Sequence, residues 1–200
     1  MSAGDETIRF YTVRDHIRTR TGMYINNTRG GKSIGDGVYL LLMEVMENAT
    51  DEFRAGFGDR LEIRCGETHF SVRDFGRGIP PESLRAVCEK PYGDRGIGTD
   101  GIAAAAYGPG LNVVLNLCRE FRIRTVRGGR SRELRYLDGE LADDRAGNTD
   151  EPSGTLVEAY PDPEIFPGLK LRQNCLRDLV SLHLAANPGL EIGFGFNAGG

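Results

Sequence analysis

Apolar residues crowd one stretch near position 40 and leave little room for a polar face. Residues 38–46 are apolar around most of a helical circumference, and the polar positions in or beside this run are Glu44, Glu47 and Asn48. Such a pattern predicts a buried helix, which a loop rich in Gly, Asn and Thr precedes at residues 26–36. Because a buried carboxylate must be paired or functional, Glu44 is the first candidate for chemistry.

Strands are indicated where polar and apolar residues alternate along the chain. The predicted strands are residues 61–64, 70–74, 121–126, 131–136, 155–160 and 190–196, of which the first two and the next two form hairpins. Further helices are predicted at residues 80–88, 111–118 and 175–186, and an acidic loop at residues 138–153. Since helices and strands do not alternate regularly, an α+β sandwich is favoured over a doubly wound parallel sheet.

Residues 89–110 form a long stretch without hydrophobic periodicity. They are rich in glycine and contain few large apolar side chains apart from Tyr92, Ile97 and Ile102. This composition is typical of a mobile surface loop. We interpret residues 89–110 as a lid over a binding site, and the polar residues 1–11 as an N-terminal arm.

The composition limits the class of protein without identifying it. A chain of 200 residues suits one domain with one core, and a formal net charge of −4 does not by itself favour contact with nucleic acid. The four cysteines are widely spaced, so reduced thiols in the cytoplasm are expected rather than a zinc knuckle or a disulfide framework. No apolar run approaches the roughly 20 residues that span a bilayer, so no membrane contact is expected.

Two glycine motifs and three histidines are weaker candidates. Residues 30–33 (Gly-Gly-Lys-Ser) resemble the end of a phosphate loop, but the first glycine position of that motif is Asn26. Residues 96–101 fit the dinucleotide fingerprint literally, yet no strand leads into them. The histidines share no spacing and are expected at surface or core positions; they are His16, His69 and His183.

The strongest chemical signal combines the apolar helix with a glycine-rich turn farther along the chain. Glu44 and Asn48 are four residues apart, so a helix places the carboxylate beside the amide on one face. A carboxylate can act as a base, and an amide oxygen can bind Mg²⁺. Asp74 ends a predicted strand and leads into residues 75–80 (Phe-Gly-Arg-Gly-Ile-Pro), whose glycines let backbone approach a flat ligand. The two blocks predict a nucleotide site outside the phosphate-loop folds.

These blocks resemble the ATP-binding domain of type IIA DNA topoisomerases, namely the gyrase B and topoisomerase IV B subunits. This domain is one of the Bergerat-fold (GHKL) ATPases, which also include Hsp90-type chaperones, MutL and histidine kinases. The resemblance covers nearly the whole chain, in residues 21–25 (Thr-Gly-Met-Tyr-Ile), 44–52, 74–80, 108–110 (Gly-Pro-Gly), 153–155 (Ser-Gly-Thr) and 161–166. The Gly-Met-Tyr-Ile segment and the Gly-Arg-Gly-Ile-Pro run favour the topoisomerase branch.

The resemblance implies a fold and the centre of a site. The fold would be a two-layer α+β sandwich of a mixed, mainly antiparallel sheet with helices on one face. Glu44 would be the general base that deprotonates the attacking water, and Asn48 would be the Mg²⁺ ligand. Asp74 would accept the adenine amino hydrogen bond, together with Thr155 through a water.

Further residues implied by the resemblance surround this centre. Arg77 could pair with Glu52 at the mouth of the pocket, and backbone N–H groups of the lid would hold the phosphates. The complete set of implied nucleotide-binding residues is Asn48, Asp51, Glu52, Asp74, Gly76, Arg77, Gly78, Ile79, Pro80, Gly108, Gly110 and Thr155.

The resemblance also implies cofactors, partners and domain boundaries. The cofactors would be ATP and Mg²⁺. In the full subunit the arm would join a homodimer, a DNA-cleaving A-type subunit would be the partner, and other domains would contact DNA. Residues 1–200 would be a single ATP-binding domain without the family's transducer domain, so hydrolysis by this chain alone is expected to be slow.

One departure from the family pattern leaves other functions open. The family's lid sequence is roughly Gly-Gly-Leu-His-Gly-Val-Gly, whereas residues 104–110 are Ala-Ala-Ala-Tyr-Gly-Pro-Gly, and Pro109 cannot donate an N–H. An alternative is therefore a nucleotide-binding switch that has lost hydrolysis. Another is a different GHKL ATPase, of the MutL or chaperone type. Gyrase and topoisomerase IV are not separated by these residues.

Overall fold

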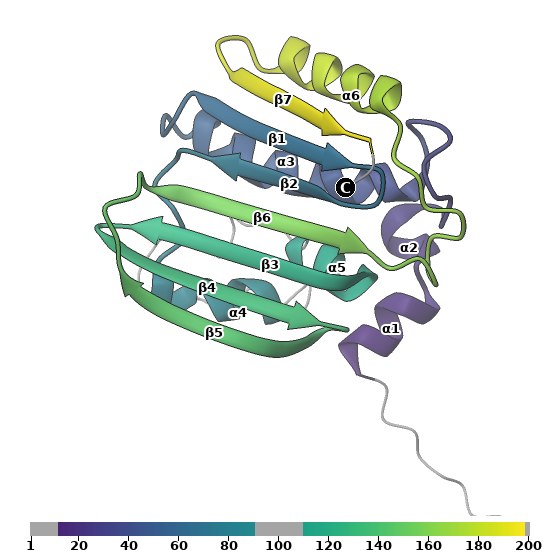
Figure 1. Ribbon diagram of the computed structural model, residues 1–200, viewed down its shortest axis with the longest axis horizontal. Helices are drawn as coiled ribbons and strands as arrows, with labels where there is room; N and C mark the ends of the chain where they lie inside the picture. The colour runs from purple at the N-terminus through teal and green to yellow at the C-terminus, as the bar shows by residue number, and fades with distance from the viewer. Residues whose placement is uncertain (1–11, 91–109, 199–200) are drawn as a thin grey trace, which may run out of the picture.

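A computed structural model describes residues 12–90 and 110–198, which form one seven-stranded sheet with helices packed against it (Figure 1). The strands lie in the order β5-β4-β3-β6-β2-β1-β7. Their bounds are β1 (Arg60–Gly66), β2 (Phe70–Asp74), β3 (Cys118–Arg127), β4 (Arg130–Leu137), β5 (Glu140–Asn148), β6 (Gly154–Pro161) and β7 (Glu191–Asn197). Only the β1–β7 pair of this described sheet is parallel, and the other five pairs are antiparallel. The predicted mixed, mainly antiparallel sheet is confirmed.

The helices lie mainly behind the sheet in the view of Figure 1, where α3, α4 and α5 cover one face. Their bounds are α1 (Val13–Thr19), α2 (Gly22–Ile25), α3 (Gly37–Arg54), the 3₁₀ turn η1 (Pro81–Ser83), α4 (Leu84–Glu89), α5 (Gly110–Leu117) and α6 (Gln173–Ala186). Helix α6 joins the same layer, because the buried side chain of His183 contacts Thr50 of α3 at 2.6 Å. This arrangement confirms the α+β sandwich.

Helix α3 is the long central helix, and its buried face explains why the sequence forms it. Val38, Tyr39, Leu41, Leu42, Val45 and Met46 are at most 2% exposed. Met43 and Glu44, however, are exposed. The prediction of a helix buried around nearly its whole circumference is therefore wrong at this turn, because neighbouring elements cover α3 on one broad face only. The helix also extends to Arg54, beyond the apolar run.

The predicted loop at residues 138–153 is wrong, since most of it is the edge strand β5. Most of its residues are exposed, and four of the nine are charged, so it lacks the alternation that marks a half-buried strand. Backbone pairing with β4 forms it, across a tight turn in which Asp138 and Gly139 both have positive φ values of 49° and 81°. Two consecutive residues with positive φ match a type I′ hairpin turn. The Asp-Gly dipeptide was the signal for this strand.

The other predicted elements are confirmed with small shifts of their ends. Both predicted hairpins, β1–β2 and β3–β4, are present, as are β6, β7, α5 and α6. The predicted helix at residues 80–88 divides into η1 and α4. The predicted arm (1–11) and most of the predicted lid (91–109) lie outside the described residues. Among the described helices, none combines the length and the hydropathy that crossing a membrane requires.

Candidate functional site

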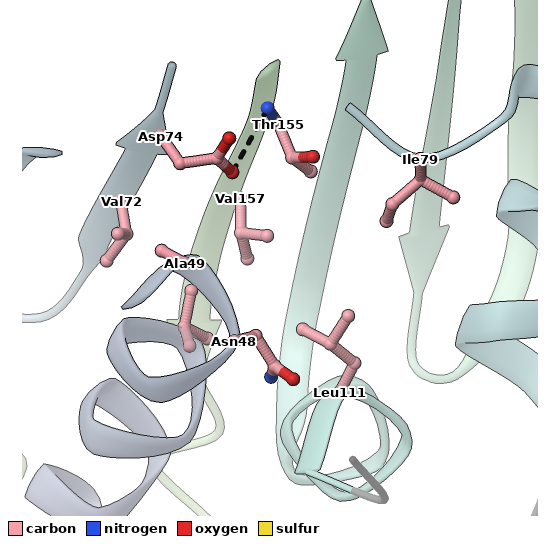
Figure 2. A pocket seen from close by; sticks show the side chains of 9 residues that line it. Asn48, Ala49, Val72, Asp74, Ile79, Leu111, Thr155 and Val157 are labelled. Atoms are coloured by element: carbon pink, nitrogen blue, oxygen red, sulfur yellow. Dashed lines mark hydrogen bonds between the residues drawn. The ribbon is translucent and has the colours of Figure 1, made fainter. Parts of the chain in front are cut away.

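A pocket opens between the helical layer and the middle of the sheet (Figure 2). It encloses about 310 Å³ of empty space, part of which is open to solvent. Its lining is mainly apolar with three polar members, and consists of Val45, Asn48 and Ala49 of α3, Val72 and Asp74 of β2, Ile79, Leu111 of α5, and Thr155 and Val157 of β6. An apolar pocket with few polar groups fixes the orientation of a ligand through those groups.

Asp74 is the buried carboxylate of this pocket, at 5% exposure. Its Oδ1 accepts a hydrogen bond from the Gly76 backbone N–H at 2.9 Å, and its Oδ2 accepts one from the Thr155 N–H at 3.1 Å (Figure 2). Burial raises the pKa of Asp74 to about 6, although both backbone hydrogen bonds act in the opposite direction. A carboxylate oxygen has two acceptor sites, so Asp74 can still accept a donor from a ligand.

Two glycines allow the backbone to come close around Asp74. Gly154 has φ of +136°, and a Cβ there would lie 2.2 Å from the Asp74 carbonyl oxygen. Gly78 has φ of +74°, and a Cβ there would lie 2.2 Å from the Val126 carbonyl oxygen. A side chain at either position would collide with backbone, so these glycines are required for β6 and for the turn that carries Ile79 into the pocket.

Asn48 and Glu44 lie one helical turn apart at the edge of the pocket. The Asn48 Nδ2 donates to the Glu44 backbone oxygen at 2.7 Å, which leaves Oδ1 available to a ligand or cation. Glu44 is exposed, and its carboxylate approaches the first residue of α5, since a Cβ on Gly110 would lie 2.1 Å from the Glu44 Oε2. Partial removal from water raises the pKa of Glu44, and the nearby charge of Glu47 adds to this.

Glu52 and Arg77 form an ion pair next to Asp74. The Glu52 carboxylate accepts hydrogen bonds from the Arg77 backbone N–H, Nε and Nη2 at 2.9, 3.1 and 2.9 Å. The guanidinium carbon also lies 3.9 Å from the centre of the Phe57 ring. Burial alone would raise the pKa of Glu52, but the bonds and charge of Arg77 outweigh it and lower this pKa. The predicted pairing of Arg77 with Glu52 is confirmed.

The structure brings some of the predicted site residues together in the pocket and leaves others around it. Asn48, Asp74, Ile79 and Thr155 line it. Five more surround these without lining the pocket, namely Glu52, Gly76, Arg77, Gly78 and Gly110. Pro80 immediately precedes η1. Asp51 is not among the lining residues, and its Oδ1 pairs with the Arg54 Nη1 at 3.0 Å. Gly108 lies outside the described residues.

Sequence reasoning missed five of the six apolar lining residues, namely Val45, Ala49, Val72, Leu111 and Val157. The alternation along the two strands could have found two of them, Val72 and Val157. Val72 lies two residues before Asp74 on β2, and Val157 lies two residues after Thr155 on β6, so each shares the face of the polar residue. The two valines are directly opposite each other in the sheet register.

Of the motifs judged weak in the sequence, the loop at residues 30–33 and the three histidines lie in the described part of the chain, and none of them lines this pocket. The backbone N–H groups of Gly31, Lys32 and Ser33 all donate to the buried Asp36 Oδ2, so that loop binds its own carboxylate rather than a phosphate. His16 contacts Tyr24, His69 stacks on Tyr160 and His183 contacts Thr50. The fingerprint at residues 96–101 lies outside the described residues.

The donor set near the pocket suits a metal held mainly by a ligand. Within residues 12–90 and 110–198, no group of three or more His, Cys, Asp or Glu side chains could hold a metal ion by itself. The Asn48 Oδ1 is an oxygen donor of the kind that Mg²⁺ accepts, and Mg²⁺ commonly binds through one or two protein oxygens plus substrate phosphates. The residues present therefore fit Mg²⁺ only together with a phosphate ligand.

Fold and pocket together define a class of protein. A buried carboxylate at the base of an apolar pocket, an acid and an amide at its edge, and a sheet covered by helices on one face describe a nucleotide-binding α+β domain without a phosphate loop. The comparisons with known proteins agree. The family model of histidine kinase-, DNA gyrase B- and HSP90-like ATPases matches residues 34–165, and the chain belongs to this family.

Individual relatives are similar over most of this chain. The B subunit of DNA topoisomerase 4 from Borreliella burgdorferi is 32% identical over 189 residues, which are 90% of this chain and 30% of that protein. The B subunit of DNA gyrase from Thermotoga maritima is 31% identical over 202 residues, which cover 94% of this chain and 31% of that protein. The chain thus spans about a third of these curated relatives.

A solved structure shares the fold. The crystal structure of the 43K ATPase domain of Thermus thermophilus gyrase B, in complex with an aminocoumarin, superposes with a TM-score of 0.75 at 26% identity. The similarity covers 92% of this chain and 48% of that one. The resemblance seen in the sequence is confirmed by these similarities.

Proposed function

We propose that this chain binds Mg²⁺·ATP in the pocket around Asp74 and hydrolyses it as the ATPase domain of a type IIA DNA topoisomerase. The observation that carries the proposal is the buried Asp74 carboxylate among the lining of an apolar pocket, which Asn48 of α3 also lines, with Glu44 one helical turn away on the same helix. Family membership and the similarity to gyrase B and topoisomerase IV B subunits support the same function.

Asp74 would select adenine by its hydrogen-bonding capacity. Each of its oxygens accepts one backbone N–H, and the acceptor capacity that remains suits the amino group of adenine. The apolar side chains of Val72, Ile79 and Val157 would contact the faces of the purine ring. The Thr155 hydroxyl, on the strand next to Asp74, would complete the contact through a water.

Glu44 and Asn48 would supply the chemistry at the edge of the pocket. Bound Mg²⁺ would neutralise charge that develops on the phosphates, with the Asn48 Oδ1 as its protein ligand. Glu44 would orient the attacking water and accept its proton, a role that suits a partly desolvated carboxylate with a raised pKa. The backbone N–H of Gly110 would donate to the phosphates, and that of Gly108 is proposed on sequence alone.

Arg77 and Glu52 would shape the entrance of the pocket. Their three hydrogen bonds fix the Asp74–Pro80 turn to the end of α3, while the Arg77 side chain remains about one third exposed. Asp51 would act indirectly, by holding Arg54 on the outer face of α3.

The assembly around this domain is also part of the proposal. Nucleotide binding would drive dimerisation through the arm at residues 1–11, in a cytoplasmic complex with a DNA-cleaving A-type subunit, and other domains would contact DNA. Pro109, which lacks an N–H in the predicted lid, favours a second candidate function, a nucleotide-dependent switch without hydrolysis.

Phosphate release by wild-type chain and by a Glu44→Ala variant tests the proposal. We expect slow, Mg²⁺-dependent release by the wild type, and a variant that binds an ATP analogue with wild-type affinity but releases no phosphate. Equal turnover of both proteins would contradict the role of Glu44. Tight binding without release by the wild type, also within the full subunit, would select the switch.

A further inference from the structure

Helix α5 carries two buried amides where its other buried side chains are apolar. All eight of its residues are buried, and Asn112 and Asn116 are each only 5% exposed. Burying an amide without partners lowers stability, so a helix of this kind favours apolar residues unless the amide makes a specific bond. Both amides make such bonds, and their partners differ.

Asn112 reaches across to the neighbouring helix. Its Nδ2 donates to the backbone oxygen of Cys88 at 2.9 Å, in the last turn of α4, where carbonyl groups lack partners within the helix. The reverse orientation would place the amide oxygen against the carbonyl oxygen, so this partner fixes which way the amide points. The Nδ2 of Asn116 instead donates within α5 itself, to the Asn112 backbone oxygen at 2.8 Å and, at the longer distance of 3.4 Å, to the Asn112 Oδ1.

The residues just before Asn112 border the proposed site. Leu111 lines the pocket, and Gly110 lies against Glu44, where an added Cβ would be 2.1 Å from Oε2 and 3.0 Å from the Glu44 Cβ. Three consecutive residues of one helical turn therefore contact Glu44, the pocket and α4. A shift of this turn would move the Gly110 backbone and thereby change the space that is left for the Glu44 carboxylate.

We propose that Asn112 is a positioning residue of the nucleotide site, which holds the first turn of α5 on α4 and thereby fixes Gly110 against Glu44. The inference rests on the proposed function, because Glu44 matters here as the base for water attack. If Asn112 served only to cap α4, its loss would lower the stability of the fold and leave the turnover of the folded protein unchanged.

Two substitutions on the same helix separate these roles. Asn112→Leu removes the bond to Cys88 and replaces the amide with an apolar side chain of similar shape. Asn116→Leu removes an equally buried amide whose two bonds both stay inside α5 and leaves the Asn112 bond to Cys88 in place. Thermal unfolding gives the stability of each variant. Phosphate release at saturating Mg²⁺·ATP, well below the unfolding temperature, gives kcat, and KM is measured alongside.

For Asn112→Leu we expect kcat to fall by about tenfold or more, since misplacement by about 1 Å can cost that much. Asn116→Leu should keep a kcat close to that of the wild type, even if it lowers the stability of the fold by as much as Asn112→Leu does. Wild-type kcat in folded Asn112→Leu, or an equal loss in both variants, would overturn the inference. If leucine prevents folding at either site, Asn112→Ala and Asn116→Ala make the same comparison. A wild-type chain without turnover would instead contradict the proposed function, and this inference with it.

Discussion

The raised pKa of Asp74 predicts that adenine binding depends on pH in a range where few carboxylates titrate. Burial sets this pKa at about 6. At pH 7 the carboxyl group is about nine tenths ionised, and at pH 5 only about one tenth is ionised. A protonated Asp74 would place a hydrogen on an oxygen that already accepts a backbone N–H from Gly76 or Thr155. Binding of a ligand that donates to Asp74 should therefore require the ionised form.

The expected size of the effect follows from these fractions. Affinity should fall by about tenfold from pH 7 to pH 5, because the ionised fraction falls by that factor. Adenosine is the suitable probe, since it has no phosphate that titrates in this range. Calorimetric titrations at pH 5, 6, 7 and 8 would give the dissociation constants, and thermal unfolding at each pH would show that the chain stays folded.

The stability of the chain has the opposite dependence on the same group. Because the folded pKa of Asp74 is raised, its contribution to stability is present at low pH and is lost as the pH rises through about 6. Weaker binding at pH 5 therefore does not follow from unfolding caused by Asp74. The control is Asp74→Asn, which should bind weakly at every pH. Wild-type affinity that is flat from pH 5 to 8, or the same tenfold change in the variant, would refute the reasoning.

Two further substitutions test contacts around the pocket. Gly110→Ala should keep the fold, because the added Cβ meets the flexible end of the Glu44 side chain. It should displace the Glu44 carboxylate and lower kcat on the order of 10- to 100-fold, while the affinity for adenosine is retained. A wild-type kcat in this variant would contradict the contact between Gly110 and Glu44. Arg77→Ala should destabilise the chain by about 1–3 kcal/mol in urea unfolding, because the buried Glu52 loses its partner. Since the pKa of Glu52 is lowered, the deficit should shrink as the pH falls through the carboxyl range, and a deficit that stays constant would argue against this pair.

The fold could be predicted where the burial of one face imposes a regular alternation of apolar and polar residues. Strands such as β2 and β6, with one face on the core, alternate in the sequence as they do in the structure. β5 could not be found in this way, because it is an edge strand whose order comes from backbone pairing to β4. The exposure of Glu44 also did not follow from the sequence, since only the positions of neighbouring elements decide which part of α3 remains uncovered.

The site was predictable in its polar members more than in its walls. Asp74 and Asn48 stand out because amides and carboxylates are rare among apolar neighbours. The pocket walls from Val45 to Val157 resemble ordinary core residues, and only the register of β2 with β6 shows that Val72 and Val157 face the same space. The bond from Asn112 to Cys88 joins residues on two helices, and neither motif nor spacing indicates it.

The most direct test of the account is a calorimetric titration of the chain with a non-hydrolysable ATP analogue, with and without Mg²⁺, followed by a coumarin-type gyrase inhibitor as competitor. The account predicts Mg²⁺-dependent binding at one site, which the inhibitor displaces and Asp74→Asn weakens. Binding of neither ligand to the folded chain, or analogue binding that survives in Asp74→Asn unchanged, would contradict the assignment of this pocket as the nucleotide site.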